Sequence, residues 1–290
     1  MSLTAFAPVS AARRRKDRIM RGVLLTLTLV AFVPLILIVY YLLHKGLTAV
    51  TGSGFFTTDP TGSFFGNQGG VRSAILGTLE IVLIASAIAI PIGIGVALYL
   101  TEYGRDSRFA DAVRYFVDVM TGVPSIVFGL FVYITLVLAG VGGAFAGWKG
   151  SIALALLMLP IVVRAAEVVL LLVPAGLREA ALALGAPRWR VMLRVVLPTA
   201  LPGLVTGSLL AIARGMGETA PLLFTVSVAF GATLDPTKQM NTLPVQIYND
   251  ISSPNPVLNS RAWGAALTLV AIVLILNLLA RLIARGSRMS

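Results

Sequence analysis

Six stretches of this sequence are apolar over enough residues to cross a membrane, and they constrain the fold more than any other feature. A helix needs about 20 predominantly apolar residues to span the hydrocarbon core of a bilayer. Lipid offers no hydrogen-bond partner to peptide groups, so each such stretch has to be helical. The stretches cover residues 22–43, 75–100, 113–139, 151–173, 198–232 and 262–283. We therefore expect an all-α polytopic membrane protein with about six transmembrane helices.

Composition supports this class and excludes several others. Of the 290 residues, 57% are hydrophobic and only 12% are charged, whereas soluble domains are about a quarter charged. The chain has no cysteine, which excludes disulfides, thiol catalysis and cysteine-ligated metals. His44 is the sole histidine and cannot form a metal cluster by itself. The net charge of +11 could indicate nucleic-acid binding, but the basic residues flank the apolar stretches, which favours a topology signal.

The distribution of Lys and Arg predicts the orientation. With both termini in the cytoplasm, the inner side carries 16 basic residues and the outer side carries five, Lys45, Arg72, Lys149, Lys238 and Arg261. Such an excess is the positive-inside pattern. A secretory signal peptide is the alternative for the N-terminus, but 22–43 is too long for its apolar region and no A-x-A site follows. We expect an uncleaved first helix and both termini in the cytoplasm of a bacterial plasma membrane.

Three of the apolar stretches contain residues that disturb helices. The second, third and fifth are long and carry Pro91, Pro124, Pro202 and Gly207. Proline removes a backbone donor, and membrane helices tolerate this only with local readjustment. We expect these three spans to be kinked, tilted or extended into water.

A predicted inner loop over residues 174–198 carries the most specific pattern. Leu177, Ala180, Ala181 and Leu184 recur at helical spacing and form one apolar stripe. Gly185 suits the left-handed position that ends a helix, and Pro187 suits the first turn of the next. Trp189, Met192 and Leu193 would give this second helix an apolar face. The loop presents a partly apolar knob, although an ordinary interfacial amphipathic helix would show a similar pattern.

Charged residues also occur within the predicted spans. Arg214 and Glu218 are four residues apart in the fifth, and Arg164 and Glu167 are three apart in the fourth, spacings at which helical side chains can pair. A charge at membrane depth costs at least about 2.5 kcal/mol and normally faces a cavity or a partner. Either pair could line a pathway or lock helices together. Arg164 could also reach the headgroups, and Glu80 fits an interfacial position.

Motifs of enzymatic chemistry are missing from the sequence. No G-x-x-x-x-G-K-[ST] loop occurs, so we do not expect this chain to bind or hydrolyse ATP. Nor does the sequence offer a convergent set of His, Cys and carboxylate residues for other catalysis. We expect a protein that is not an enzyme and that holds no cofactor of its own.

The inner loop resembles the EAA loop of importer-type ABC permeases, E-A-A-x-x-x-G followed by a hydrophobic residue, any residue and Leu-Pro. The matching residues are Glu179, Ala180, Ala181, Gly185, Val195, Leu197 and Pro198. Valine replaces the commoner isoleucine, and the match covers about 20 residues. The resemblance implies that Glu179, Ala180, Ala181, Leu184, Gly185 and Pro198 couple the chain to a cytoplasmic ATPase.

Three further segments, 121–129, 214–223 and 243–249, are similar to PstA-type permeases of bacterial phosphate importers, in the binding-protein-dependent transport family. This resemblance implies the type I ABC importer permease fold and a phosphate pathway that includes Arg214, Glu218 and Arg164. It also implies a second permease of PstC type, two copies of a PstB-type ATPase that holds ATP and magnesium, and an external PstS-type phosphate-binding protein.

The resemblance also divides the chain. Residues 1–21 would be a basic cytoplasmic N-terminus, 22–74 the first helix with an external loop, 75–285 the permease domain, and 286–290 a tail. Three alternatives remain: an ABC permease for sulfate, molybdate or phosphonate; a self-sufficient secondary transporter or channel; and a membrane enzyme, which would need a constellation that the sequence lacks.

Overall fold

All regular secondary structure among the described residues is helical. The computed structural model describes residues 10–61, 69–104 and 107–286, with side chains as far as Leu279. The predicted tail from 287 on, Arg105 and the middle of the predicted external loop therefore lie outside the described residues. The α-helices are α1 (Ala11–Val50), α2 (Arg72–Leu98), α3 (Arg108–Gly122), α4 (Ser125–Val132), α5 (Gly147–Leu171), α6 (Ala175–Ala183), α7 (Arg188–Val191), α8 (Leu197–Met216), α9 (Ala220–Thr225), α10 (Leu243–Ile251) and α11 (Pro256–Gly286). Three π-helical turns, η1 (Tyr99–Tyr103), η2 (Tyr133–Val137) and η3 (Met192–Val196), extend or join them.

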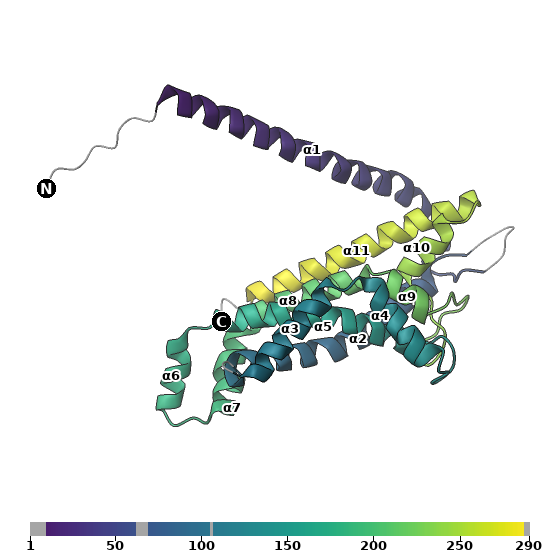
Figure 1. Cartoon of the computed structure of the whole chain (residues 1–290). Coiled ribbons are helices and arrows are strands. Elements are labelled where there is room, and N and C mark those ends of the chain that lie inside the picture. Colours follow the sequence, from purple (N-terminus) through teal and green to yellow (C-terminus); the bar gives the residue numbers. More distant parts are fainter. Residues whose placement is uncertain (1–9, 62–68, 105–106, 287–290) are drawn as a thin grey trace.

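The predicted number of spans is confirmed. Among the described residues, five helices are long and apolar enough to cross a membrane, and a sixth span results if the bent pair of α3 with α4 and η2 counts as one. Figure 1 shows that α1 begins, and α11 ends, at the same end of the molecule as α6 and α7, while α10 lies at the opposite end. We call these the α6–α7 end and the α10 end.

The core forms where α2, α5 and α8 pack together. Buried residues of α2 and α5, among them Ile81, Ala85 and Met158, form its main cluster. Glycines of α8 allow close approach: a Cβ on Gly207 would lie 2.6 Å from Ala165 Cβ, and one on Gly215 would lie 2.8 Å from Met158 Sδ. In lipid the hydrophobic effect does not drive helices together, so membrane helices associate largely through van der Waals packing. Small residues at the contact make this packing close.

The third predicted span is broken. The axes of α3 and of α4 with η2 meet at 101°, and the break contains Val123 and Pro124. Proline disfavours helical backbone at the residue before it, and Val123 is extended, with φ −71° and ψ 130°. Pro124 then precedes the first turn of α4, where its missing N–H does no harm. The expected disturbance at Pro124 is therefore a sharp corner.

The fifth predicted span is shorter than expected. A continuous helix over 198–232 is wrong, because α8 ends at Met216 with Gly217 as its C-cap. The short α9 follows, and residues 226–229 have no regular structure. By contrast, α2 and α8 continue through Pro91 and Pro202. Glycines on both sides of Met216 weaken the helix there, which hydropathy alone does not report.

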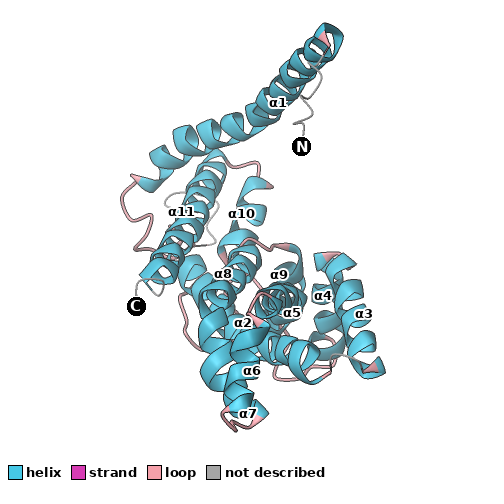
Figure 2. Ribbon diagram, turned by 90° about the vertical axis from the view of Figure 1, so that its left-hand side faces the viewer, coloured by secondary structure: helices cyan, strands magenta, loops and turns pink. Residues whose placement is uncertain are grey.

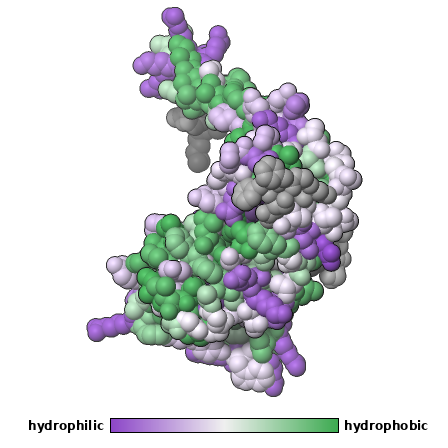
Figure 3. Space-filling view, turned by 90° about the vertical axis from the view of Figure 1, so that its right-hand side faces the viewer, coloured by the Kyte–Doolittle hydropathy of each residue, from purple (hydrophilic) through white to green (hydrophobic). Residues whose placement is uncertain are grey.

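Helix α1 leaves the bundle as an arm (Figures 1 and 2). None of its most apolar window is buried. It contacts α11 near its C-terminal end, where the Gly46 position lies against Leu267 and the ammonium of Lys45 lies 5.3 Å from the ring of Trp263. Apolar side chains dominate the arm and much of the body in Figure 3. The exposed apolar surface of α1 is therefore suited to contact with lipid or with another membrane protein.

Candidate functional site

A cavity of about 610 Å³ lies inside the membrane-spanning part of the molecule. It is bounded by the corner between α3 and α4, by one face of α5 and by the second half of α8. The lining residues are Met120, Thr121, Val123, Ser125, Phe128, Leu157, Pro160, Ile161, Leu210, Ala213 and Arg214. Arg214 is the only charged residue in this lining. The cavity is thus a largely apolar pocket that is open to the outside of the molecule near exposed Leu210, with one cation in its wall.

Two motifs that lie 90 residues apart in the sequence meet beside this cavity. Gly129 of α4 packs against α9, where a Cβ added to it would lie 2.5 Å from Pro221 Cα. The rings of Tyr133 and Phe224 meet edge to face, with 6.0 Å between centroids. Segments 121–129 and 214–223 therefore build one wall together.

Arg214 and Glu218 form the ion pair that their spacing predicted. The guanidinium Nη2 lies 3.4 Å from Glu218 Oε1. Glu218 follows the end of α8, so the pair crosses the C-terminus of that helix, where the helix dipole favours a cation. The Arg214 side chain is 61% exposed and that of Glu218 only 15%. The carboxylate is held in the protein while the arginine is open to the cavity.

Arg164 and Glu167 also pair, but within a larger network between α3 and α5. Arg164 Nη1 donates to Glu167 Oε2 at 2.7 Å, and Arg114 Nε donates to Glu167 Oε1 at 3.0 Å. Arg164 Nη2 reaches the carboxylate of Asp118 and the backbone oxygen of Arg114. Arg114 also bonds Asp111 and the carbonyl of Leu100. Buried Glu167 is thus the centre of a polar network that ties the two helices together.

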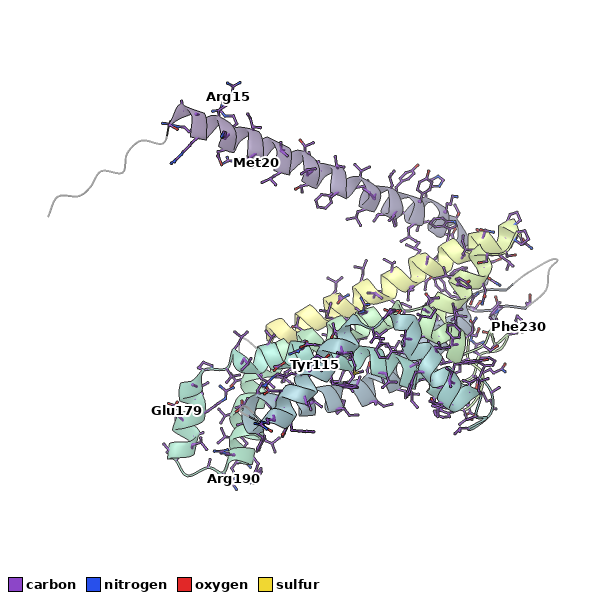
Figure 4. All side chains as sticks on the ribbon, in the orientation of Figure 1. Arg15, Met20, Tyr115, Glu179, Arg190 and Phe230 are labelled. Atoms are coloured by element: carbon purple, nitrogen blue, oxygen red, sulfur yellow. The ribbon has the colours of Figure 1, made fainter. Side chains whose placement is uncertain are left out.

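The loop between α5 and α8 projects from the α6–α7 end as a separate knob. Glu179 on α6 and Arg190 on α7 lie on this knob in Figure 4, far from Phe230 at the other end. No residue of α6 is buried, and Leu184 is 89% exposed. Gly185 has φ +75°, as expected for a left-handed helix end.

The base of this knob is tied to the bundle through Arg178. Its guanidinium donates to the carbonyls of Leu170 and Val173 at 2.8 and 2.6 Å and to Glu102 Oε1 at 3.0 Å. The two carbonyls belong to the C-terminal end of α5, which a cation stabilises. Arg178 therefore ties α6 to the end of α5, a helix that lines the cavity.

Comparisons with known proteins decide the family. Residues 89–289 match the family model described as binding-protein-dependent transport system inner membrane component. The chain belongs to this family. It is 42% identical over 280 residues to phosphate transport system permease protein PstA 1 of Mycobacterium tuberculosis (strain CDC 1551 / Oshkosh), covering 96% of this chain and 91% of that protein. It is 43% identical over 274 residues to PstA of Yersinia pestis, covering 94% and 91%.

Solved structures of ABC transporters share the fold of this permease. A chain of a bacterial alginate ABC transporter superposes with a TM-score of 0.68 at 15% identity, covering 94% of this chain and 96% of that one. A chain of the MetNI methionine ABC transporter superposes with a TM-score of 0.58 at 22% identity, covering 75% and 94%. The expected all-α, type I ABC importer permease fold is confirmed, and with it a multi-pass inner-membrane subunit.

The predicted site residues of the permease fall into two separate places. Arg214, Glu218 and Arg164 lie within the bundle, whereas Glu179, Ala180, Leu184 and Gly185 lie on the exposed knob. Ala181 is half-buried and packs against the cluster at the base of the knob. Pro198 is the second residue of α8, and Pro187 is the residue just before α7.

Sequence reasoning missed Asp118 and the inward role of Arg114, which the charge count treated as an inner-loop residue. Asp111, Arg114 and Asp118 follow one another at three and four residues, so they share a face of a single helix. That pattern was readable, because three charges on one helix face need partners at membrane depth. The sequence does not indicate that their partners are Glu167 and Arg164 of α5.

Segment 243–249, the third segment of the family resemblance, and Glu80 lie toward the α10 end. Gln246 of α10 bonds Asn241 at 2.9 Å and the carbonyl of Gly70, and the backbone N–H of Leu243 donates to Thr78 of α2 at 2.8 Å. Segment 243–249 thus closes the bundle at this end. Glu80 is half-buried, and its Oε2 is enclosed without a hydrogen-bond partner among the described residues.

Proposed function

We propose that this permease forms part of the membrane pathway of an ATP-driven importer of inorganic phosphate. The observation that carries the proposal is Arg214, a cation exposed to an apolar cavity whose wall is built from two motifs far apart in sequence. The names of the relatives, phosphate transport system permease proteins, support phosphate as the anion. A water takes about 30 Å³ in the liquid, so a cavity of 610 Å³ has room for a partly hydrated oxyanion.

The chemistry of Arg214 suits this anion. Phosphate loses part of its hydration in a narrow pathway, so the wall must supply fixed positive donors. A guanidinium offers two parallel N–H groups to two phosphate oxygens and stays charged when desolvated. Glu218 would hold the guanidinium in place between transport events and release it to an arriving anion. The 3.4 Å separation is loose enough for such exchange.

Partners follow from the family and from the knob. A PstC-type permease would complete the pathway, and the α1 arm and exposed faces of the bundle provide surface for it. Two PstB-type ATPase subunits would hold ATP and magnesium, and one of them would bind the knob formed by α6, Gly185 and α7, with Glu179, Ala180 and Leu184 at the contact. A PstS-type protein would deliver phosphate at the α10 end. Under this proposal both termini and the knob lie in the cytoplasm.

Replacing Arg214 tests the proposal. In the assembled transporter, Arg214→Ala is expected to lower phosphate uptake at least about tenfold, because a hydrogen bond to a charged group is worth roughly 1.5–3 kcal/mol, while ATP hydrolysis continues. Arg214→Lys should retain little uptake, and Glu218→Gln should be milder than loss of the arginine. Uptake of labelled phosphate and ATPase activity of the same preparation measure this.

Arg21→Ala is the matched control. Arg21 also pairs with a carboxylate four residues away, Asp17, at 3.5 Å, but on the exposed start of α1. Wild-type uptake by a fully assembled Arg214→Ala transporter would show that the Arg214–Glu218 pair only braces α8. Competition by sulfate, molybdate or a phosphonate stronger than that by phosphate would assign the pathway to another oxyanion.

A further inference from the structure

Arg164 lies on the same face of α5 as the cavity lining. Leu157, Pro160 and Ile161 line the cavity, and position 164 continues their spacing by three, four and seven residues. Contacts of α8 with α5 put Gly215 beside Met158 and Gly207 beside Ala165. Arg164 is therefore about 8 Å nearer the α6–α7 end than Arg214, at the rise of 1.5 Å per helical residue. Arg164 thus lies just beyond the α5 residues that line the cavity, on the same face of that helix.

Two carboxylates contact Arg164, and their surroundings differ. The Glu167 side chain is 10% exposed and binds Arg164 and Arg114 with separate oxygens. The Asp118 side chain is 62% exposed and contacts Nη2 of Arg164 from α3. Breaking a buried pair leaves an uncompensated charge, whereas an exposed pair separates at little cost. Glu167 therefore holds the guanidinium of Arg164 in place, whereas the carboxylate of Asp118 can move away from it.

Asp118 is not needed to join the two helices. Arg114 of α3 bonds Glu167 of α5 at 3.0 Å, and Arg164 of α5 bonds the Arg114 carbonyl at 3.3 Å. Neither contact involves an atom of Asp118. An open carboxylate within a membrane span faces a cavity or pathway rather than lipid.

We propose that Asp118 is an exchangeable substitute for the transported anion on Arg164. Carboxylate and phosphate present oxygens to a guanidinium in the same way. Phosphate arriving from Arg214 would displace Asp118 from Nη2, and the returning carboxylate would then expel phosphate toward the α6–α7 end. The inference rests on the proposed function and adds a release step to it.

The proposal predicts a change in product inhibition. The complete transporter, with partner permease, ATPase and binding protein, is placed in vesicles that contain ATP and increasing lumenal phosphate, and uptake of labelled phosphate is measured. In Asp118→Asn no carboxylate competes for Arg164, so phosphate rebinds from the lumen. The lumenal concentration that halves uptake should fall about twofold to fivefold, the range that a partly exposed ion pair controls. Asp118→Glu should move this midpoint back toward wild type.

Asp111→Asn is the matched control. Asp111 lies on the same helix, is 73% exposed and pairs with Arg114 at 3.2 Å, but it does not touch Arg164 in the described contacts. A wild-type midpoint in assembled Asp118→Asn, or an equal shift in Asp111→Asn, would overturn the proposal. If Asp118→Asn does not assemble, Asp118→Ser is measured by the same criteria. Arg214→Ala in the same vesicles separates the two ideas: normal uptake by it contradicts the proposed pathway, whereas its inactivity beside an unshifted Asp118→Asn contradicts only the release step.

Discussion

At the scale of single residues, Gly185 determines how the knob at the α6–α7 end turns. Its φ of +75° lies in the left-handed region, which costs a residue with a Cβ about 1–2 kcal/mol. Its amide bonds the carbonyl of Leu182, and that of Ala186 bonds the carbonyl of Ala181, which closes the end of α6. The exposed leucines of the knob depend on this turn for their position.

A substitution at Gly185 should loosen this turn locally. Gly185→Ala is expected to lower the protection of amides in 175–191 against hydrogen exchange by roughly 5- to 30-fold, the equivalent of 1–2 kcal/mol. Gly176→Ala is the control, since Gly176 lies within α6, has open space around it and has no positive φ. Equal exchange in the two variants would argue against strain at Gly185.

The knob also shows which residue should test ATPase docking. Ala181 packs against the base of the knob, so Ala181→Trp would disturb folding as well as docking. Ala180 is exposed. Ala180→Trp should therefore reduce co-purification of the ATPase, or its stimulation by the binding protein, while leaving the thermal midpoint of the permease unchanged. Full coupling in that variant would exclude this face from the contact.

At the scale of elements, the contact between α5 and α8 sets the relative positions of Arg164 and Arg214, the two arginines of the proposed pathway. Gly207 makes this contact close, because a Cβ there would meet Ala165 at 2.6 Å. Separation of the helices would move Arg214 away from the level of Leu157 and widen the cavity. The packing of small residues therefore serves the geometry of the site as well as stability.

A larger residue at this contact should destabilise the permease. Gly207→Val is expected to cost about 1–3 kcal/mol, the typical effect of overpacking, and to lower the thermal midpoint of the purified transporter. Gly95→Val provides the comparison, since nothing lies within 4 Å of a Cβ at Gly95. A midpoint for Gly207→Val no lower than that for Gly95→Val would contradict close packing of α5 on α8.

At the scale of the whole molecule, the basic start of α1, the knob and the end of α11 share one end (Figure 1). The positive-inside pattern predicts that this end faces the cytoplasm. The permease has no cysteine, so single cysteines can be labelled without background from this chain.

Two exposed positions at opposite ends test this orientation. In sealed cells, an impermeant thiol reagent should label Thr57→Cys, before α2, and spare Leu184→Cys on the knob. Disrupted cells, in which both positions should react, provide the control. Labelling of Leu184→Cys in sealed cells would reverse the orientation.

Several features were predictable from local pattern alone. Apolar length and the lipid's lack of hydrogen-bond partners are enough to specify the helical class and the number of spans. The spacing of Arg214 and Glu218, and of Arg164 and Glu167, is enough to predict each pair, because residues three and four apart share a helix face. Gly185 and the stripe from Leu177 to Leu184 likewise report a helix and its end from short-range chemistry.

Other features depend on residues that are distant in sequence. The cavity exists because Gly129 meets Pro221 and α5 packs on α8, and no local pattern contains the distance between these segments. The sequence shows Asp118 as a charge in a predicted span, but its contact with Arg164 depends on the packing of α3 against α5. Short-range spacing therefore determined the helices and the charge pairs within them, whereas packing between helices decided which charges face the cavity and which brace its wall.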